Sequence, residues 1–334
     1  MKKTISEDLI LIGEGVLDKK DRQILYQLDV DARQSYAEIS KKVGLSKEVV
    51  NYRIKQLEQK GIIKGYYAVL DIAKLGFLNF RVFLKFYNTT PEKEEEILDY
   101  LMRHPSVGWL VSVQGSWDTN MLVWAENIFK FEEFWNEFMH KYRNYIEKKW
   151  ISIVTKLLHY RKAYLFNLKK EDEPVEVSGG ELKVIVDEVD WQILRILAPD
   201  ARTSLLSIAE NLKMSPEAIS YRIKQLEKKG VILSYRALLD LEKIGARYFK
   251  VHFYLQNMNE QKEKELFAYA RYNPNIIFVD ITVGGADFEI ELHVKNNTHF
   301  RTILEDMKRK FSGIIRNYES FLYYKEYKWV YLPI

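Results

Sequence analysis

The sequence has 334 residues, of which 47% are hydrophobic and 29% charged, as is typical of a globular protein long enough for more than one domain. Its formal net charge is only +4, so an argument for nucleic-acid binding must rest on where the charge lies. The absence of cysteine excludes disulfide scaffolds, thiolate zinc sites and thiol nucleophiles. The apolar run at 9–12 is too short for a signal peptide or a membrane span, so we expect a cytoplasmic protein with no membrane partner.

After an N-terminal extension at 1–17, the first predicted elements are three short helices. They cover residues 20–28, 35–43 and 46–60. Ser46 is suited to cap the third helix, and Lys60-Gly61 is a typical end for it. The short break at Gly44-Leu45 is the tight connection of a helix-turn-helix, to which we assign residues 18–65.

The pattern then changes to strands, after a short extended connector at 62–70. The predicted order is strand 80–86, helix 92–103, strands 107–113 and 119–124, helix 129–142 and strand 151–158. This βαββαβ order predicts a ferredoxin-like domain at 66–167, with helices on one sheet face and the other face left for a partner.

The whole arrangement is then repeated. The seven residues at 52–58 return unchanged at 221–227, and the same shift of 169 residues aligns Asp71 with Asp240. The chain is therefore a tandem duplication joined by a charged and then flexible linker at 168–186. We predict an α+β fold: two copies of a winged-helix-like helix-turn-helix domain, each followed by a ferredoxin-like effector or assembly domain. The second copies cover 187–234 and 235–334.

In the third helix of each unit, an apolar stripe such as Val50, Ile54 and Leu57 faces the core. The opposite face is polar, and a solvated surface is the ordinary interpretation of one such face. Two matching faces favour contact with bases and phosphates of double-stranded DNA. The predicted DNA-contacting residues are Ser46, Lys47, Asn51, Tyr52 and Lys55 in the first unit, and Ser215, Ser220, Tyr221, Lys224 and Lys228 in the second.

Local charge favours the first of these units as the stronger DNA binder. Residues 18–70 hold eleven basic and seven acidic side chains, whereas residues 187–239 hold eight and seven. Arg53 and Arg222 remain open, since each could contact a phosphate or pair with a carboxylate such as Glu58 or Glu227.

These motifs resemble the Lrp/AsnC, or feast/famine, family of transcription regulators. The resemblance rests on the following βαββαβ half and on these residues, which repeat in the second copy: Asp21 with Ile24-Leu25, 46–50, Arg53-Ile54, Leu57-Glu58 and Gly61-Ile62-Ile63. It implies DNA binding, a domain that pairs through its sheets, homo-oligomers, and sensing of a small molecule such as an amino acid. Two modules in one chain could pair their sheets internally and present two different recognition helices to an asymmetric operator.

The resemblance also places effectors near the loop between the middle strands. The matching residues are Gly115, Ser116, Trp117 and Asp118 in the first copy, and Gly284, Gly285, Ala286 and Asp287 in the second. Glycine amides could approach a carboxylate and aspartate could hold an ammonium group. An ordinary hairpin turn is an equally good interpretation. Trp117 should narrow a pocket that Ala286 leaves open.

Siroheme decarboxylases resemble the same arrangement, so an enzyme is the alternative function. Such an enzyme would gather cationic and imidazole groups around a tetrapyrrole, but none of the six histidines has a histidine counterpart in the other copy. A single asymmetric site stays open, as does a ligand-sensing subunit that has lost DNA binding. We predict no catalytic residue, metal site or cofactor, because no motif for one stands out.

Overall fold

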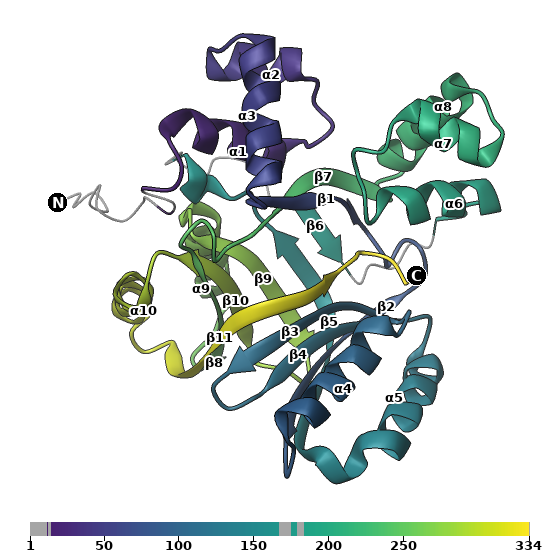
Figure 1. The fold of residues 1–334 in the computed structure, drawn as a ribbon. Coiled ribbons are helices and arrows are strands. Elements are labelled where there is room, and N and C mark those ends of the chain that lie inside the picture. The colour runs from purple at the N-terminus through teal and green to yellow at the C-terminus, as the bar shows by residue number, and fades with distance from the viewer. Residues whose placement is uncertain (1–11, 13–14, 167–174, 179–183, 334) are drawn as a thin grey trace.

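The computed structural model describes residue 12 and residues 15–166, 175–178 and 184–333. Two helical units lie on the same side of a β-barrel, and further helices cover the outside of the barrel (Figure 1). The α+β class, with two helix-turn-helix units and two ferredoxin-like halves, is as predicted.

Each helical unit has three helices with side-chain caps. The first unit contains α1 (Lys19–Val30), α2 (Tyr36–Val43) and α3 (Lys47–Gln59), and the second contains α6 (Glu188–Leu197), α7 (Leu205–Leu212) and α8 (Pro216–Lys228). Ser46 Oγ accepts a hydrogen bond from the Val49 amide at 3.3 Å, and Ser215 Oγ accepts one from the Ala218 amide at 3.2 Å. The third helices of the two units, α3 and α8, therefore begin at the serines that the sequence predicted. They occupy the position of the recognition helix in a helix-turn-helix, and we use that name for them.

The segment predicted as an extended connector is a strand. β1 (Ile63–Leu70) pairs antiparallel with β7 (Ile232–Leu239), its counterpart in the other copy. The sequence alone could not indicate this pairing, because the two strands lie far apart in the chain. The resulting ribbon joins the two helical units.

The ferredoxin-like halves have the predicted βαββαβ order. In the first half this order is β2 (Leu78–Phe86), α4 (Pro91–Arg103), β3 (Val107–Gln114), β4 (Thr119–Ala125), α5 (Ile128–Tyr142) and β5 (Ile146–His159). In the second half it is β8 (Arg247–Leu255), α9 (Glu260–Tyr272), β9 (Ile276–Val283), β10 (Phe288–Val294), α10 (Asn297–Lys310) and β11 (Ile315–Trp329).

The two sheets join into one closed barrel. Neighbours in it follow the order β2, β4, β3, β11, β8, β10, β9 and β5, and β5 returns to pair with β2. The long strands β5 and β11 make this closure. The first part of each pairs with its own copy, and the remaining part pairs with the other copy. Sheet faces that would otherwise meet a second chain are thus covered within this chain.

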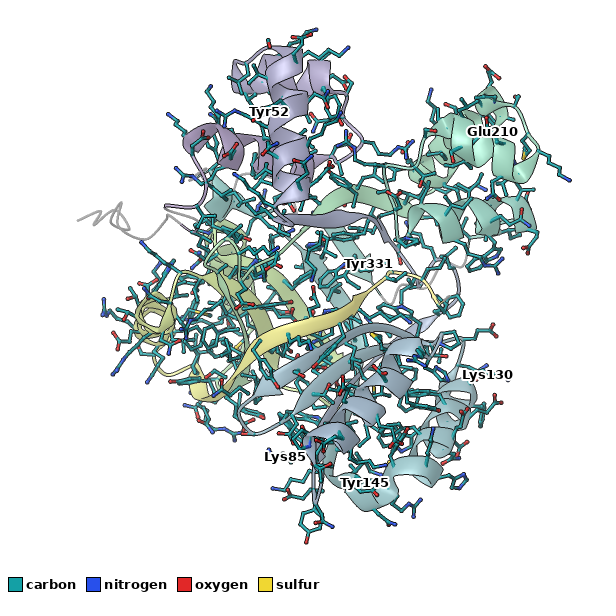
Figure 2. All side chains as sticks on the ribbon, in the orientation of Figure 1. Tyr52, Lys85, Lys130, Tyr145, Glu210 and Tyr331 are labelled. Atoms are coloured by element: carbon teal, nitrogen blue, oxygen red, sulfur yellow. The ribbon has the colours of Figure 1, made fainter. Side chains whose placement is uncertain are left out.

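Three apolar cores hold these layers together. One lies between α4, α5 and the first sheet, and another between α9, α10 and the second sheet. The third runs from both helical units through the β1–β7 ribbon into the barrel. Tyr331, in the tail after β11, lies between the ribbon and the barrel (Figure 2), where its ring stacks on Tyr67 with centroids 6.0 Å apart.

The linker predicted as flexible contains a strand. β6 (Val175–Ser178) pairs antiparallel with the end of β5 and extends the sheet beyond the closed barrel. The charged run at 169–174 and the Gly179-Gly180 pair lie outside the described residues.

The two turns that precede the recognition helices differ in strain. Both α2 and α7 end at a residue in the left-handed region, which is Gly44 at φ 65° in the first unit and Lys213 at φ 54° in the second. Glycine adopts this conformation freely, whereas a residue with a Cβ atom does so at a cost.

We therefore expect Lys213→Gly to raise the free energy of unfolding by about 0.5–1 kcal/mol, since the left-handed strain is removed. Gly44→Ala, at the matched position, should lower it by about 1 kcal/mol. Urea unfolding of both variants beside the parent measures the change. If Lys213→Gly instead lowers the free energy of unfolding, the lysine side chain stabilises the protein by more than its left-handed backbone conformation destabilises it.

Candidate nucleic-acid interface and effector segments

The predicted DNA-contacting side chains lie on the solvent side of α3 and α8. Tyr52 is 64% exposed and Tyr221 is 65% exposed, and Tyr52 marks this surface in Figure 2. The predicted lysines are exposed as well, at Lys47, Lys55, Lys224 and Lys228. Asn51 and Ser220 are half-buried beside the apolar stripe, so the tyrosines and lysines are the more accessible of these side chains.

Arg53 and Arg222 do not belong to this exposed surface. Arg53 Nη1 lies 2.7 Å from both an Asp18 and an Asp21 carboxylate oxygen, and so fastens α3 to the start of α1. Arg222 makes the same pair of contacts in the second unit, with Asp187 at 2.7 Å and Asp190 at 2.8 Å. The alternative of carboxylate pairing is therefore correct for both arginines.

The expected carboxylate partners of these arginines serve another purpose. Glu58 accepts a hydrogen bond from the Tyr66 hydroxyl at 2.7 Å, and Glu227 accepts one from the Tyr235 hydroxyl at 2.8 Å. Each glutamate thus ties its recognition helix to the ribbon strand that follows it. Because these contacts repeat in both units, α3 and α8 are held against their strands in the same way.

The aspartates of the two effector segments stabilise hairpins. Asp118 Oδ2 accepts from the Phe86 amide at 2.7 Å while its Oδ1 lies 2.7 Å from Lys85 Nζ. Asp287 Oδ2 accepts from the Leu255 amide at 2.7 Å. Each carboxylate therefore secures the β-turn to the neighbouring strand, the role that the hairpin interpretation assigns to it.

Aromatic contacts connect the two effector segments at one end of the barrel. Trp117 packs against Trp150, with ring centroids 6.2 Å apart, and Trp150 Nε1 donates to the Gly284 carbonyl at 2.6 Å. Phe83 lies beside both tryptophans. Ala286 is 2% exposed, so its side chain does not line an open pocket. A ligand here would contact both segments at a shared end of the barrel.

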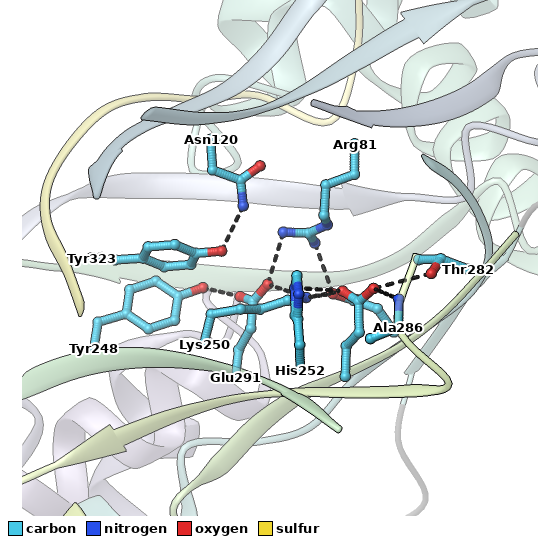
Figure 3. A network of polar contacts seen from close by, with 11 residues as sticks. Arg81, Asn120, Tyr248, Lys250, His252, Thr282, Ala286, Glu291 and Tyr323 are labelled. Carbon is cyan, nitrogen blue, oxygen red and sulfur yellow. Dashed lines mark hydrogen bonds and ion pairs between the residues drawn. The ribbon is translucent and has the colours of Figure 1, made fainter. Parts of the chain in front are cut away.

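A buried polar network fills the barrel behind the second segment (Figure 3). Arg81 of the first copy donates to Asp280 at 2.8 Å and pairs with Glu291 at 3.0 Å. Lys250 pairs with Asp280, with Glu291, and with Glu289 at 2.7 Å. All of these charged side chains are at most 3% exposed.

Further polar side chains complete the network and reach the second effector segment. Tyr248 donates to Glu291, and His252 Nε2 lies 3.4 Å from Glu289. The other Glu289 oxygen accepts from Thr282 at 3.0 Å and from the Ala286 amide at 3.3 Å. A Cβ atom on Gly285 would lie 2.0 Å from Thr282 Oγ1, so glycine is required at that position.

Burial and charge act differently on the three carboxyl groups. Burial raises the pKa of the Asp280 carboxyl above its usual value, despite the charges of Arg81 and Lys250. Although burial opposes ionisation of the two glutamates as well, Lys250 together with His252 holds the pKa of Glu289 well below its usual range. Lys250 and Arg81 lower the pKa of Glu291. Asp280 is therefore the carboxyl group of the three that most readily takes a proton.

The prediction from sequence missed this network, although a signal was present. Lys250 and His252 alternate along one strand, and Glu289, Glu291 and His293 alternate along another. Charged residues at every second position place their charges on one face of the sheet. Because that face could equally have met solvent, only the closure of the barrel shows it to be interior.

The barrel interior has little free space. The cavity beside Arg81 and Glu291 has a volume of ≈ 20 Å³, and the cavity beside His159 and Lys162 one of ≈ 30 Å³. Either is large enough for a water molecule and far too small for a tetrapyrrole. Across the described ranges, no group of three or more histidine or acidic side chains is arranged to hold a metal ion.

No helix within the described ranges combines the length and apolar character needed to cross a bilayer.

Comparison with known proteins identifies relatives of both helical units. A family model described as winged helix-turn-helix DNA-binding matches residues 17–64 and 186–232. The HTH-type transcriptional regulator LrpA of Pyrococcus horikoshii is 36% identical over 112 residues, which cover 34% of this chain and 78% of LrpA. The proline dehydrogenase transcriptional activator of Rhodobacter capsulatus is 32% identical over 123 residues, covering 36% of this chain and 80% of the activator.

The similarity to a solved structure extends over both modules. The siroheme decarboxylase NirDL aligns with a TM-score of 0.61 over 94% of each chain, at 16% sequence identity. At this identity the similarity concerns the fold, and it shows that two fused modules of this kind occur in another protein.

The buried network gives a prediction about stability. We expect Arg81→Leu to lower the free energy of unfolding by about 3–5 kcal/mol, because it leaves three buried carboxyl groups with Lys250 as their one remaining lysine or arginine partner. Lys85→Met is the matched control on the same strand. Its pair with Asp118 is roughly one-third exposed, so its loss should cost at most about 1 kcal/mol.

Urea unfolding at neutral pH measures both changes. Equal and small losses for the two variants would contradict a strong dependence of the barrel on Arg81.

Proposed function

We propose that this chain, which belongs to the Lrp/AsnC family of transcription regulators, binds double-stranded DNA through α3 and α8 as a covalent pseudo-dimer. The observation that carries this proposal is the matched pair of capped helices, each with an exposed tyrosine and lysine at equivalent positions. The shared residues Tyr52 and Tyr221, with Lys55 and Lys224, give both helices the same way of docking into a major groove.

The unshared residues support recognition of two different half-sites. Asn51 in α3 corresponds to Ser220 in α8, and Lys47 corresponds to Pro216. Asparagine can form two hydrogen bonds with adenine, whereas serine is less selective. The proposed operator is therefore asymmetric.

The proposed surfaces predict an ordered loss of affinity. Lys55→Ala should weaken binding across all sequences and reduce the slope of log affinity against log salt by about 1, since one phosphate contact is lost. Lys224→Ala should have a smaller effect, because the second unit holds nearly equal numbers of basic and acidic residues. Lys130→Ala, on α5 at the opposite side of the molecule (Figure 2), should have none.

Fluorescence anisotropy with duplexes selected from genomic fragments, at several salt concentrations, measures these effects. Binding that is insensitive to salt, or equally sensitive to Lys130→Ala, would contradict the proposed interface.

The enzyme alternative has one supporting observation and one opposing it. The structure gathers Arg81, Lys250 and His252 in one asymmetric cluster, which is the grouping expected around a tetrapyrrole. Their charges are, however, already matched by buried carboxylates, and the adjoining cavity is ≈ 20 Å³. Absence of DNA binding together with a bound, light-absorbing iron-uroporphyrin would favour the enzyme.

We further propose that an amino-acid-like effector binds where residues 115–118 and 284–287 approach each other. The support is the chain of contacts from Trp117 through Trp150 to Gly284, which brings the two loops together at one end of the barrel. Gly115 and Gly284 are exposed residues, and glycine lets a carboxylate approach the backbone amides closely. Association of several chains, which the family also implies, would have to use outer surfaces, since the inner sheet faces are covered.

This proposal predicts a fluorescence response at Trp117. A panel of the standard amino acids should include one that changes the tryptophan emission of the parent protein, and Trp117→Phe should remove most of that change. Trp191→Phe, on α6, is the control and should retain it. An unchanged response in Trp117→Phe would place the ligand elsewhere.

A further inference from the structure

Each recognition helix ends against a lysine that comes from the other copy of the module. Lys243 Nζ, from the second copy, donates to the Lys60 carbonyl at the end of α3, at 2.8 Å. Lys74 Nζ, from the first copy, donates to the Lys229 and Gly230 carbonyls after α8, each at 3.3 Å. Lys74 and Lys243 occupy equivalent positions, so the two contacts are reciprocal.

The end of a helix is a favourable place for these ammonium groups. The last carbonyls of a helix have no partner within it, and the helix dipole makes that end negative. Glycine follows in both copies, at φ 65° for Gly61 and 66° for Gly230. A Cβ atom at either glycine would lie 2.5 Å from the lysine Nζ, so these two glycines also leave room for the lysine of the other copy.

The turns that carry the lysines are themselves fixed on the other copy. The Asp71 amide donates to the Val231 carbonyl at 2.9 Å, and the Asp240 amide donates to the Ile62 carbonyl at 2.9 Å. The carboxylate of each aspartate then accepts from the amide of its own lysine, Lys74 at 3.3 Å and Lys243 at 3.0 Å. The backbone of each lysine is therefore fixed on the other copy, and its solvent-accessible side chain reaches the helix end from there.

A second set of contacts joins the bases of the two helical units. The Ala32 amide donates to the Tyr235 carbonyl and the Ala201 amide to the Tyr66 carbonyl, both at 2.9 Å. Arg33 Nη1 donates to the Ala201 carbonyl at 2.6 Å. These contacts and the β1–β7 ribbon restrict the positions of the units, while the lysines act directly on the recognition helices.

We propose that Lys74 and Lys243 are positioning residues that fix the separation and orientation of α3 and α8, and thereby the spacing of the two DNA half-sites that the protein accepts. The part that concerns DNA rests on the proposed function. The partner is a duplex whose two half-sites lie at one set spacing, because helices held on a common frame cannot follow half-sites that move apart. Because each lysine comes from the other copy, its contact connects the two modules and also stabilises the end of the helix.

The first arm of the test measures the helices without DNA. Because the chain has no cysteine, spin labels can be attached at Glu48→Cys on α3 and Glu217→Cys on α8, two exposed and equivalent positions. We expect a narrow distance distribution by electron–electron double resonance in the labelled parent. Lys74→Met with Lys243→Met removes both ammonium groups but keeps most of each side chain, and it should widen the distribution about twofold, as one fixed contact per helix is lost.

The second arm measures the spacing preference on DNA. One inserted base pair moves a half-site by about 3.4 Å and turns it by roughly 35°, and we expect it to weaken parent binding about tenfold. The double lysine variant should lose less than about threefold, since its helices can adjust. Lys130→Met with Lys308→Met, on the outer helices α5 and α10, is the matched control and should behave as the parent in both arms.

The two arms separate failure of this inference from failure of the proposed function. An unchanged distance distribution in the double lysine variant overturns the inference, whatever the protein binds. A widened distribution with an unchanged spacing preference overturns its consequence for DNA. No DNA binding by the parent, with the distribution still widened by the variant, refutes the proposed function and leaves the lysines as positioning residues of the two helices.

Discussion

The fold depends on Arg81 lying between Asp280 and Glu291 in the closed barrel. A guanidinium group buried without partners would be too costly, so the sheet that carries it must meet a sheet that carries acids. The first copy supplies Arg81, and the second copy supplies the three carboxylates together with Lys250. Two first-copy sheets would bury two arginines without acids, and two second-copy sheets would bury six acids with only two lysines, so the interior favours pairing of unlike copies.

This requirement explains how a duplicated sequence makes an asymmetric molecule. The cation is shared, since Lys250 corresponds to Arg81, but the acids are not. The first copy has Val111 in place of Asp280, Asn120 in place of Glu289 and Leu122 in place of Glu291. The backbone remains nearly two-fold symmetric because strand order, turns and caps repeat. The two copies thus differ in the barrel interior and on the polar faces of α3 and α8, where Asn51 corresponds to Ser220.

Barrel closure also determines where the recognition helices lie. The strands that leave the helical units meet as the β1–β7 ribbon above the barrel, and the turns after them reach the end of the opposite recognition helix. The two helices are thereby held on one common frame. Here that frame consists of backbone hydrogen bonds between copies, together with the Lys74 and Lys243 side chains that reach the ends of the two helices.

The sequence by itself determined the duplication, the βαββαβ order, the capped recognition helices and their exposed faces, because caps and hydrophobic periodicity are local properties of the chain. Even the role of Arg53 was open from sequence, since Asp18 and Asp21 lie more than thirty residues away from it.

Only the tertiary structure decided that 63–70 pairs with 232–239, that Lys74 and Lys243 reach the opposite helices, and that Arg81 and Glu291 face each other inside a barrel. These are contacts between residues more than 150 positions apart, and the charges involved would have been equally acceptable on a solvent-facing strand. When the two sheets close, these charged side chains are buried away from solvent, and they must then pair with each other. The contacts of Arg81 with Asp280 and Glu291 connect the two copies for this reason.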